Sequence, residues 1–219
     1  MQLPELLDRA VSLLYPQRCM RCDDLVEYDD LFCGRCFRHT SVRAEPPFAH
    51  GLAGLGAIYE YKGRGRRLVW EIKAGAPKRV CYILGYDMHT LLRELWGEVE
   101  FDMIVPVPAT QTRLEAQGFN HAELLAQPLS RLAGIPIRPD TLVRAESTLT
   151  QRYLNRENRK ENAERSYQAG RVEELSGKTI LLVDDLLTTG WTLTACAGRL
   201  LGAGAAKVYG LTAAATPFR

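Results

Sequence analysis

The segment from Thr179 to Leu193, TILLVDDLLTTGWTL, constrains the fold of this chain more than any other part of it. Its apolar beginning predicts a buried strand, and two adjacent acids, Asp184 and Asp185, follow at the carboxyl end of that strand. A Thr-Thr-Gly turn then leads into a predicted helix that begins at Thr192. In open parallel sheets, ligands bind outside the carboxyl ends of the strands. This order of elements therefore predicts a ligand site at that edge of a parallel sheet.

The start of the predicted helix is suited to a phosphate group. Unpaired backbone N–H groups and the positive end of the helix dipole attract anions, and Gly190 lets the backbone approach the phosphate oxygens closely. Hydroxyl donors are supplied by the threonines of the turn, Thr188, Thr189 and Thr192. The two acids would repel that phosphate, so we expect them to accept hydrogen bonds from ribose hydroxyls, near a hydrated Mg²⁺. The alternative is that the same residues only cap a helix and turn the chain.

Predicted strands and helices alternate through the rest of the chain after Gly56. Apolar runs predict further strands at residues 57–61, 103–107 and 207–213. Helical spacing predicts helices at residues 3–14, 66–73, 80–96, 122–133 and 192–201. The alternation indicates an α/β fold with a mainly parallel sheet and flanking helices. A stretch rich in Pro and Gly at residues 45–56 separates a small N-terminal module, residues 1–50, from the main domain, residues 51–219.

Four cysteines in the N-terminal module have the spacing C-x₂-C-x₁₀-C-x₂-C, and they are Cys19, Cys22, Cys33 and Cys36. Two such pairs can place four thiolates on one zinc ion, which would support a module too small for its own core. The spacing therefore predicts a closed, structural Zn²⁺ site, with a redox-active C-x-x-C pair as the alternative. Thiolate ligands and the lack of an export signal indicate the cytoplasm.

Charge and hydropathy argue against two classes of protein, one that binds nucleic acid over its whole surface and one that spans a membrane. The formal net charge is only +2, so the whole surface has no strong attraction to nucleic acid. No stretch approaches the roughly 20 apolar residues that span a bilayer, so no membrane insertion is expected.

Residues 144–171 stand apart because they hold seven basic and four acidic residues without an apolar period. A long charged loop inside an α/β domain is typical of a functional segment, although a solvated surface loop is the simpler alternative.

A second predicted strand end supplies further candidate ligands. The strand that ends in VPVP, residues 105–108, leads into Arg113 and then into Gly118 and Asn120. A loop at the end of a neighbouring parallel strand is where a pyrophosphate group could meet backbone amides and a cation such as Arg113. Alternatively, the prolines only terminate an edge strand.

Taken together, the motifs resemble the ComF family in order and over nearly the whole chain. They are the cysteine module, YKGRGRRLVWEIK at residues 61–73, IVPVP at 104–108 with a downstream Arg and GFN, the T-x-x-Q-x-x-L-x-R-x-x-R-x-x-N loop at 148–162, and the VDD–TTG segment. The family usually has Arg-Gly-Phe-Asn-Gln where this chain has Gln117 to His121. His121 could hydrogen-bond a phosphate or simply begin a helix.

The resemblance implies a type I phosphoribosyltransferase fold that binds 5-phosphoribosyl-1-pyrophosphate (PRPP) together with Mg²⁺. It implies that Asp184 and Asp185 hold the ribose and that residues from Leu187 to Thr192 surround the 5′-phosphate. It also implies a loop that closes over PRPP, with Gln151, Arg156 and Arg159 in the family's positions.

Two functions remain open from the sequence, both within natural transformation and DNA uptake. One is transfer of phosphoribose from PRPP to an unknown acceptor. The other is a non-catalytic accessory protein that binds PRPP and single-stranded DNA beside a ComFA-type helicase.

Overall fold

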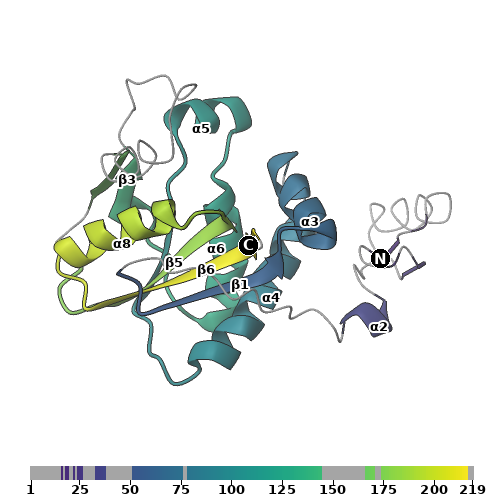
Figure 1. The fold of residues 1–219 in the computed structure, drawn as a ribbon, viewed down its shortest axis with the longest axis horizontal. Coiled ribbons are helices and arrows are strands. Elements are labelled where there is room, and N and C mark those ends of the chain that lie inside the picture. The colour runs from purple at the N-terminus through teal and green to yellow at the C-terminus, as the bar shows by residue number, and fades with distance from the viewer. Residues whose placement is uncertain are drawn as a thin grey trace, which may run out of the picture. The chain divides into compact units, whose positions relative to one another are not determined.

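The computed structural model describes residues 16, 18, 19, 22, 24–26, 33–37, 51–75, 78–144, 166–170 and 174–216. The chain divides into two compact units, Met1–Val42 and Arg43–Arg219 (Figure 1). The predicted helix at residues 3–14 lies outside the described residues, and the predicted boundary at residue 50 stays a prediction. Among the described residues, no helix combines the length and apolar character needed to cross a bilayer.

The second unit is built on a four-stranded sheet in the order β1-β6-β5-β2, and every neighbouring pair is parallel. The strands are β1 (Gly54–Glu60), β6 (Lys207–Ala215), β5 (Thr179–Leu187) and β2 (Met103–Pro106). All four carboxyl ends therefore meet at one edge of the sheet. The predicted α/β fold with a mainly parallel sheet is confirmed.

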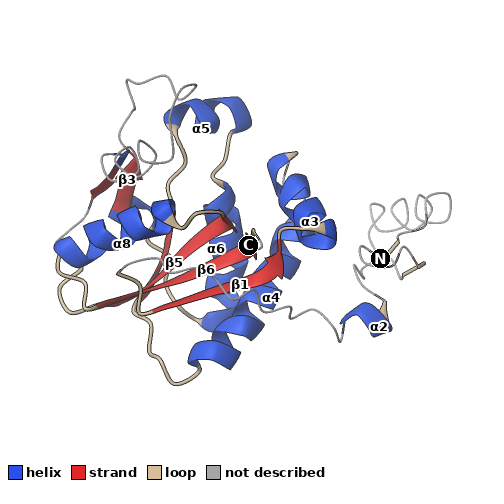
Figure 2. Cartoon of the chain, in the orientation of Figure 1, coloured by secondary structure: helices blue, strands red, loops and turns tan. Residues whose placement is uncertain are grey.

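Helices cover both faces of this sheet (Figure 2). On one face lies α8 (Trp191–Gly202), and on the other lie α4 (Lys78–Trp96) and α6 (His121–Ala133). Among the described residues, the unit also contains α3 (Gly63–Lys73), α5 (Gln111–Gln117), the 3₁₀ turn η1 (Pro139–Thr141), and an antiparallel pair formed by β3 (Leu142–Arg144) and β4 (Tyr167–Ala169).

The alternation of side chains along β5 fixes the directions of the acids at its end. Ile180 and Leu182 pack in the core cluster that includes α8, and Leu181 is fully buried between them. Successive side chains of a strand point to opposite faces of the sheet. Asp184 therefore points to the α8 side, and Asp185 points to the side of α4 and α6.

Helices α4 and α6 approach each other closely at one glycine. A Cβ atom added to Gly85 would lie 2.5 Å from Cγ of Pro128, which is a clash that no flexible side chain can relieve. Leu84 and Met88 of α4 and Leu129 of α6 are fully buried on either side of this contact. The close approach holds α6, and therefore the start of α6, firmly against the rest of the unit.

Candidate functional site

A polar cavity of about 250 Å³ lies at the carboxyl ends of β2 and β5. Residues that follow β2, the end of β5, and the first turn of α8 contribute to its wall. This is the edge of the sheet where ligands bind in open parallel α/β folds. Of the residues predicted for the site, the structure brings six together around this cavity: Arg113, Asn120, Asp184, Asp185, Thr188 and Thr192.

The two acids of β5 lie in different surroundings. The backbone N–H of Asp185 donates to Oδ1 of Asp184 at 2.9 Å. Loss of hydration raises the pKa of Asp184 well above its ordinary value, and the adjacent Asp185 carboxylate acts in the same direction. Asp185 is buried, and its Oδ2 has no hydrogen-bond partner among the described residues. Two carboxyl groups placed in this way can accept hydrogen bonds from a pair of vicinal hydroxyls.

Three cations from three different elements line the same cavity: Lys73 of α3, Arg113 of α5 and Arg144 of β3. The Nζ atom of Lys73 lies 3.4 Å from Oδ2 of Asp185. Among the described residues of the wall, the three cations outnumber the two acids, so the cavity suits an anionic ligand that also carries hydroxyl groups. Of these three cations, the sequence predicted only Arg113 as a residue of the site. Lys73 stands in the family-like motif at residues 61–73, which was a signal for this position, and Arg144 was noted only as one basic residue of the charged segment.

The first turn of α8 has the features expected of a phosphate site. Gly190 precedes the helix with φ +79°, a left-handed conformation that favours glycine, and no side chain caps the helix start. Thr188 and Thr192 line the cavity, whereas Thr189 does not. Leu187 packs in the core cluster, so its side chain lies away from the cavity. A phosphate placed in the cavity could accept hydrogen bonds from N–H groups of this first turn.

The turn between α5 and α6 is held by its own hydrogen bonds. Gly118 ends α5 with φ +78° and does not line the cavity. The side chain of Asn120 donates from Nδ2 to the carbonyl of Val107 at 3.0 Å and accepts at Oδ1 from the N–H of Ala122. Asn120 therefore caps α6 and ties it to the end of β2, which positions the wall of the cavity.

A tyrosine that the sequence did not single out forms part of the wall on the α8 side. Burial raises the pKa of Tyr167 to about 12, so its hydroxyl stays protonated, and it hydrogen-bonds Thr192. The guanidinium carbon of Arg144 lies 5.1 Å from the centre of the Tyr167 ring, a cation–π contact. The predicted loop residues Gln151, Arg156 and Arg159 lie outside the described residues, but β3 and β4, which flank that segment, both reach the cavity through Arg144 and Tyr167.

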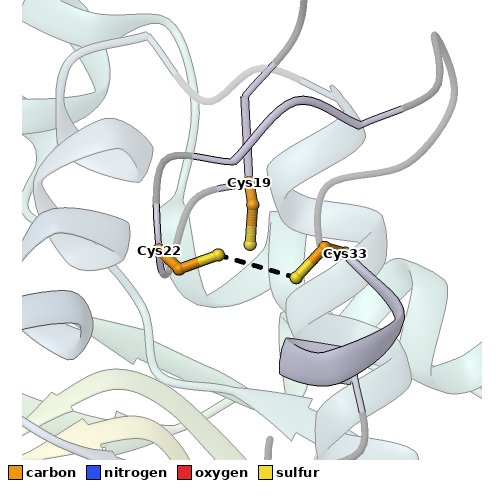
Figure 3. Close-up of side chains that lie close together, drawn as sticks. All are labelled: Cys19, Cys22 and Cys33. Atoms are coloured by element: carbon orange, nitrogen blue, oxygen red, sulfur yellow. Dashed lines mark hydrogen bonds between the residues drawn. The ribbon is translucent and has the colours of Figure 1, made fainter.

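The described cysteines of the first unit form a separate cluster (Figure 3). The Sγ atoms of Cys19, Cys22 and Cys33 all lie within 4.8 Å of one another, and those of Cys22 and Cys33 are 3.5 Å apart. Thiolates bound to one zinc ion at about 2.3 Å lie about 3.8 Å from one another, so the three sulfurs fit a shared metal ion. Cys36 lies in α2 (Gly34–Phe37), and its side chain is outside the described residues. The cluster can hold a metal ion.

The fold and the cavity define an α/β protein with a parallel sheet and a polar, predominantly cationic site at the carboxyl ends of its strands. No protein-family model matches the chain. It is 36% identical over 205 residues to competence protein F of Haemophilus influenzae, covering 90% of this chain and 84% of that protein. It is 30% identical over 196 residues to the DNA utilization protein YhgH of Escherichia coli, covering 87% and 80% respectively.

Two further similarities are more distant. Competence protein ComFC of Bacillus subtilis is 29% identical over 161 residues, which cover 71% of this chain and 62% of that protein. A solved glutamine PRPP amidotransferase from B. subtilis, complexed with ADP and GMP, aligns at 19% identity and a TM-score of 0.42, over 61% of this chain and 26% of that one. The Haemophilus and Escherichia relatives show that the chain belongs to the ComF family, as its motifs predicted.

Proposed function

We propose that this protein binds PRPP with Mg²⁺ in the cavity at the carboxyl ends of β2 and β5, and that it acts in DNA uptake and processing during natural transformation. The observation that carries the proposal is the arrangement of charge in one cavity. Two acids suited to ribose hydroxyls, three cations and residues of the turn into α8 line the same cavity. PRPP carries hydroxyls, a phosphate and a pyrophosphate on one small sugar, and each of these groups has a counterpart here.

The 5′-phosphate meets the N–H groups at the start of α8 and the hydroxyls of Thr188 and Thr192. The ribose hydroxyls meet Asp184 and Asp185. The pyrophosphate meets the cationic side, where Arg113 and Lys73 lie, and a bound Mg²⁺ would neutralise part of its charge. Gln151, Arg156 and Arg159 of the charged loop remain predicted contacts to the same pyrophosphate.

The biological role rests on the relatives. Their names refer to competence and to DNA utilization, and the proposal extends that role to this chain, acting in the cytoplasm. The alternative form of the proposal is non-catalytic: the protein binds PRPP and single-stranded DNA beside a ComFA-type helicase.

The direct test is calorimetric titration of PRPP and Mg²⁺ into the purified protein. We expect binding that is lost in a Thr192→Val and Asp185→Asn double variant and kept in Glu98→Gln, an exposed change outside the cavity. Absence of binding by the wild-type protein would refute the proposal. Release of pyrophosphate from PRPP, assayed with candidate bases and amines, separates the two forms, because only the transferase turns PRPP over.

The small N-terminal unit is proposed to hold a structural Zn²⁺ through Cys19, Cys22, Cys33 and Cys36. The distances among the three described sulfurs support this assignment. Bound zinc would supply folding free energy to the module.

A further inference from the structure

His121 is the first residue of α6, and its side chain is buried in the wall of the cavity with 3% of its surface exposed. The ring packs edge-on against Phe119, with the ring centres 5.3 Å apart, which fixes its orientation. The Nε2 atom is fully buried and has no hydrogen-bond partner among the described residues. An orphaned nitrogen of this kind normally costs about 1–3 kcal/mol, so its persistence in a ligand cavity indicates a partner that arrives with the ligand.

The charges around the ring come from every side of the cavity. Lys73 of α3 and Arg113 of α5 disfavour a further positive charge, and Asp185 of β5 favours one. Arg144 of β3 and Asp184 of β5 line the same cavity. Burial, the largest influence, and the two cations together lower the pKa of His121 below its ordinary value, despite Asp185. In the empty cavity the imidazole is therefore neutral near neutral pH.

An anionic ligand reverses this balance. A pyrophosphate group brings several negative charges among Lys73, Arg113 and His121, and it offers acceptor oxygens to a buried N–H. An opposite charge within about 4–6 Å favours the protonated form of histidine, and interactions are stronger in a cavity that excludes water. Protonation of the His121 imidazole is unfavourable in the empty protein and becomes favourable in the complex.

We propose that the His121 imidazole becomes an imidazolium contact to the pyrophosphate group of the ligand, so that filling this cavity takes up a proton. The inference rests on the proposed PRPP site and adds a pH-dependent contact to it. Affinity for the ligand then rises as the pH falls toward the range in which the liganded histidine is fully protonated, by up to about tenfold for each pH unit. Acid pH has the opposite effect on the stability of the empty protein, because the unfolded chain binds the proton more readily.

The test measures proton uptake by titrating PRPP and Mg²⁺ into the full-length protein near neutral pH, in two buffers of different ionisation enthalpy. The variant is His121→Gln, because glutamine can donate a hydrogen bond and cannot titrate. The ligand's own phosphates titrate near pH 6, so the quantity of interest is the difference between wild type and variant. We expect the wild type to take up more protons than His121→Gln. The difference should approach about one proton at a pH where His121 is neutral in the empty protein and protonated in the complex. His89→Gln, at the half-buried His89 of α4 outside this cavity, should match the wild type.

A second ligand, inorganic pyrophosphate, separates failure of this inference from failure of the PRPP site. If PRPP binds and His121→Gln takes up as many protons as the wild type, the inference is wrong and the PRPP site stands. If pyrophosphate binds with uptake that depends on His121 but PRPP does not bind, the inference holds and the PRPP proposal fails. If neither ligand binds the wild type, both are overturned.

Should His121→Gln fail to fold, nitrogen-15 spectra of the wild-type histidine rings decide the matter. The chain has four histidines, and Gln variants of His39, His50 and His89 assign the other three signals. Adding pyrophosphate at constant pH should convert the His121 signals from the neutral to the imidazolium pattern. Signals that stay neutral in the saturated complex would overturn the inference.

Discussion

The Nζ atom of Lys73, in the last turn of α3, lies 3.4 Å from Oδ2 of Asp185 at the end of β5. The Asp185 side chain is mostly buried, whereas that of Lys73 is 37% exposed. A ligand hydroxyl held by Asp185 would therefore lie near this lysine, and the pyrophosphate of the same ligand could share the lysine's charge. In the proposed complex, this pair would join the part of the cavity that binds the pyrophosphate to the part that binds the hydroxyls.

Replacing Lys73 with methionine should weaken PRPP binding by at least about tenfold, because a charge-assisted contact contributes about 1.5–3 kcal/mol. It should lower the free energy of unfolding by only about 1 kcal/mol, since the lysine is partly exposed to solvent. Titration calorimetry and urea denaturation measure the two effects. Lys62→Met, which removes an exposed ion pair with Glu60, is the control and should leave binding unchanged. Equal binding by Lys73→Met and wild type would contradict the assignment.

Replacing Asp184 with asparagine should abolish PRPP binding while stabilising the empty protein by about 1 kcal/mol at neutral pH. The raised pKa means that the folded protein keeps this proton to higher pH than the unfolded chain does. Wild-type stability therefore falls as the pH rises above the ordinary range of aspartate, and the asparagine does not titrate. Thermal melts of both proteins over acid and neutral pH should show a gap of about 2–4 °C that closes in acid. A less stable variant at neutral pH would refute this account.

Replacing Asn120 with alanine should lower the free energy of unfolding by about 1–2 kcal/mol, because the helix cap of α6 and the tie to Val107 are both lost. Thr110→Ala is the matched control. Thr110 caps α5 through the N–H of Arg113, but α5 buries none of its side chains. The control should therefore cost less, about 0.5 kcal/mol. Denaturant unfolding of the two variants compares the caps directly.

Replacing Cys22 or Cys33 with serine should remove bound zinc, measured as metal content after purification and as zinc released to a chelating dye. Cys81→Ser is the control, because Cys81 lies buried in α4 and burial raises the pKa of its thiol. It should leave the zinc content unchanged. Full zinc content in Cys22→Ser would disprove the assignment of that sulfur as a ligand.

Replacing Gly85 with alanine should destabilise the protein by about 1–3 kcal/mol, because the new Cβ collides with Pro128 of α6. The same change at Gly198, in the exposed face of α8, has no atom within 4 Å to meet. Gly198→Ala should raise stability by up to about 1 kcal/mol, since alanine favours the helix. Opposite signs for these two variants in one denaturation experiment would confirm that helix packing, and not helix propensity, controls Gly85.

Local sequence predicted the elements that depend on local chemistry. The apolar run ending in Asp184 and Asp185 predicted β5, and the turn at Gly190 predicted the start of α8. The structure has both, because a buried strand and a helix start leave periodic, short-range signals. The cysteine spacing likewise brought Cys19, Cys22 and Cys33 together, since each short pair places two sulfurs on one side of a loop.

The contents of the cavity were decided by tertiary structure. Lys73 meets Asp185, Arg144 stacks on Tyr167, and His121 loses its solvent only because α3, β3 and α6 pack against the carboxyl edge of the sheet. The chain's own pattern determined that acids, glycine and threonines meet at one strand end. The cations and the buried histidine nitrogen that lie near these residues come from elements far apart in sequence, and the packing of those elements brings them there. Side-chain periodicity carries no information about the partner across such a contact.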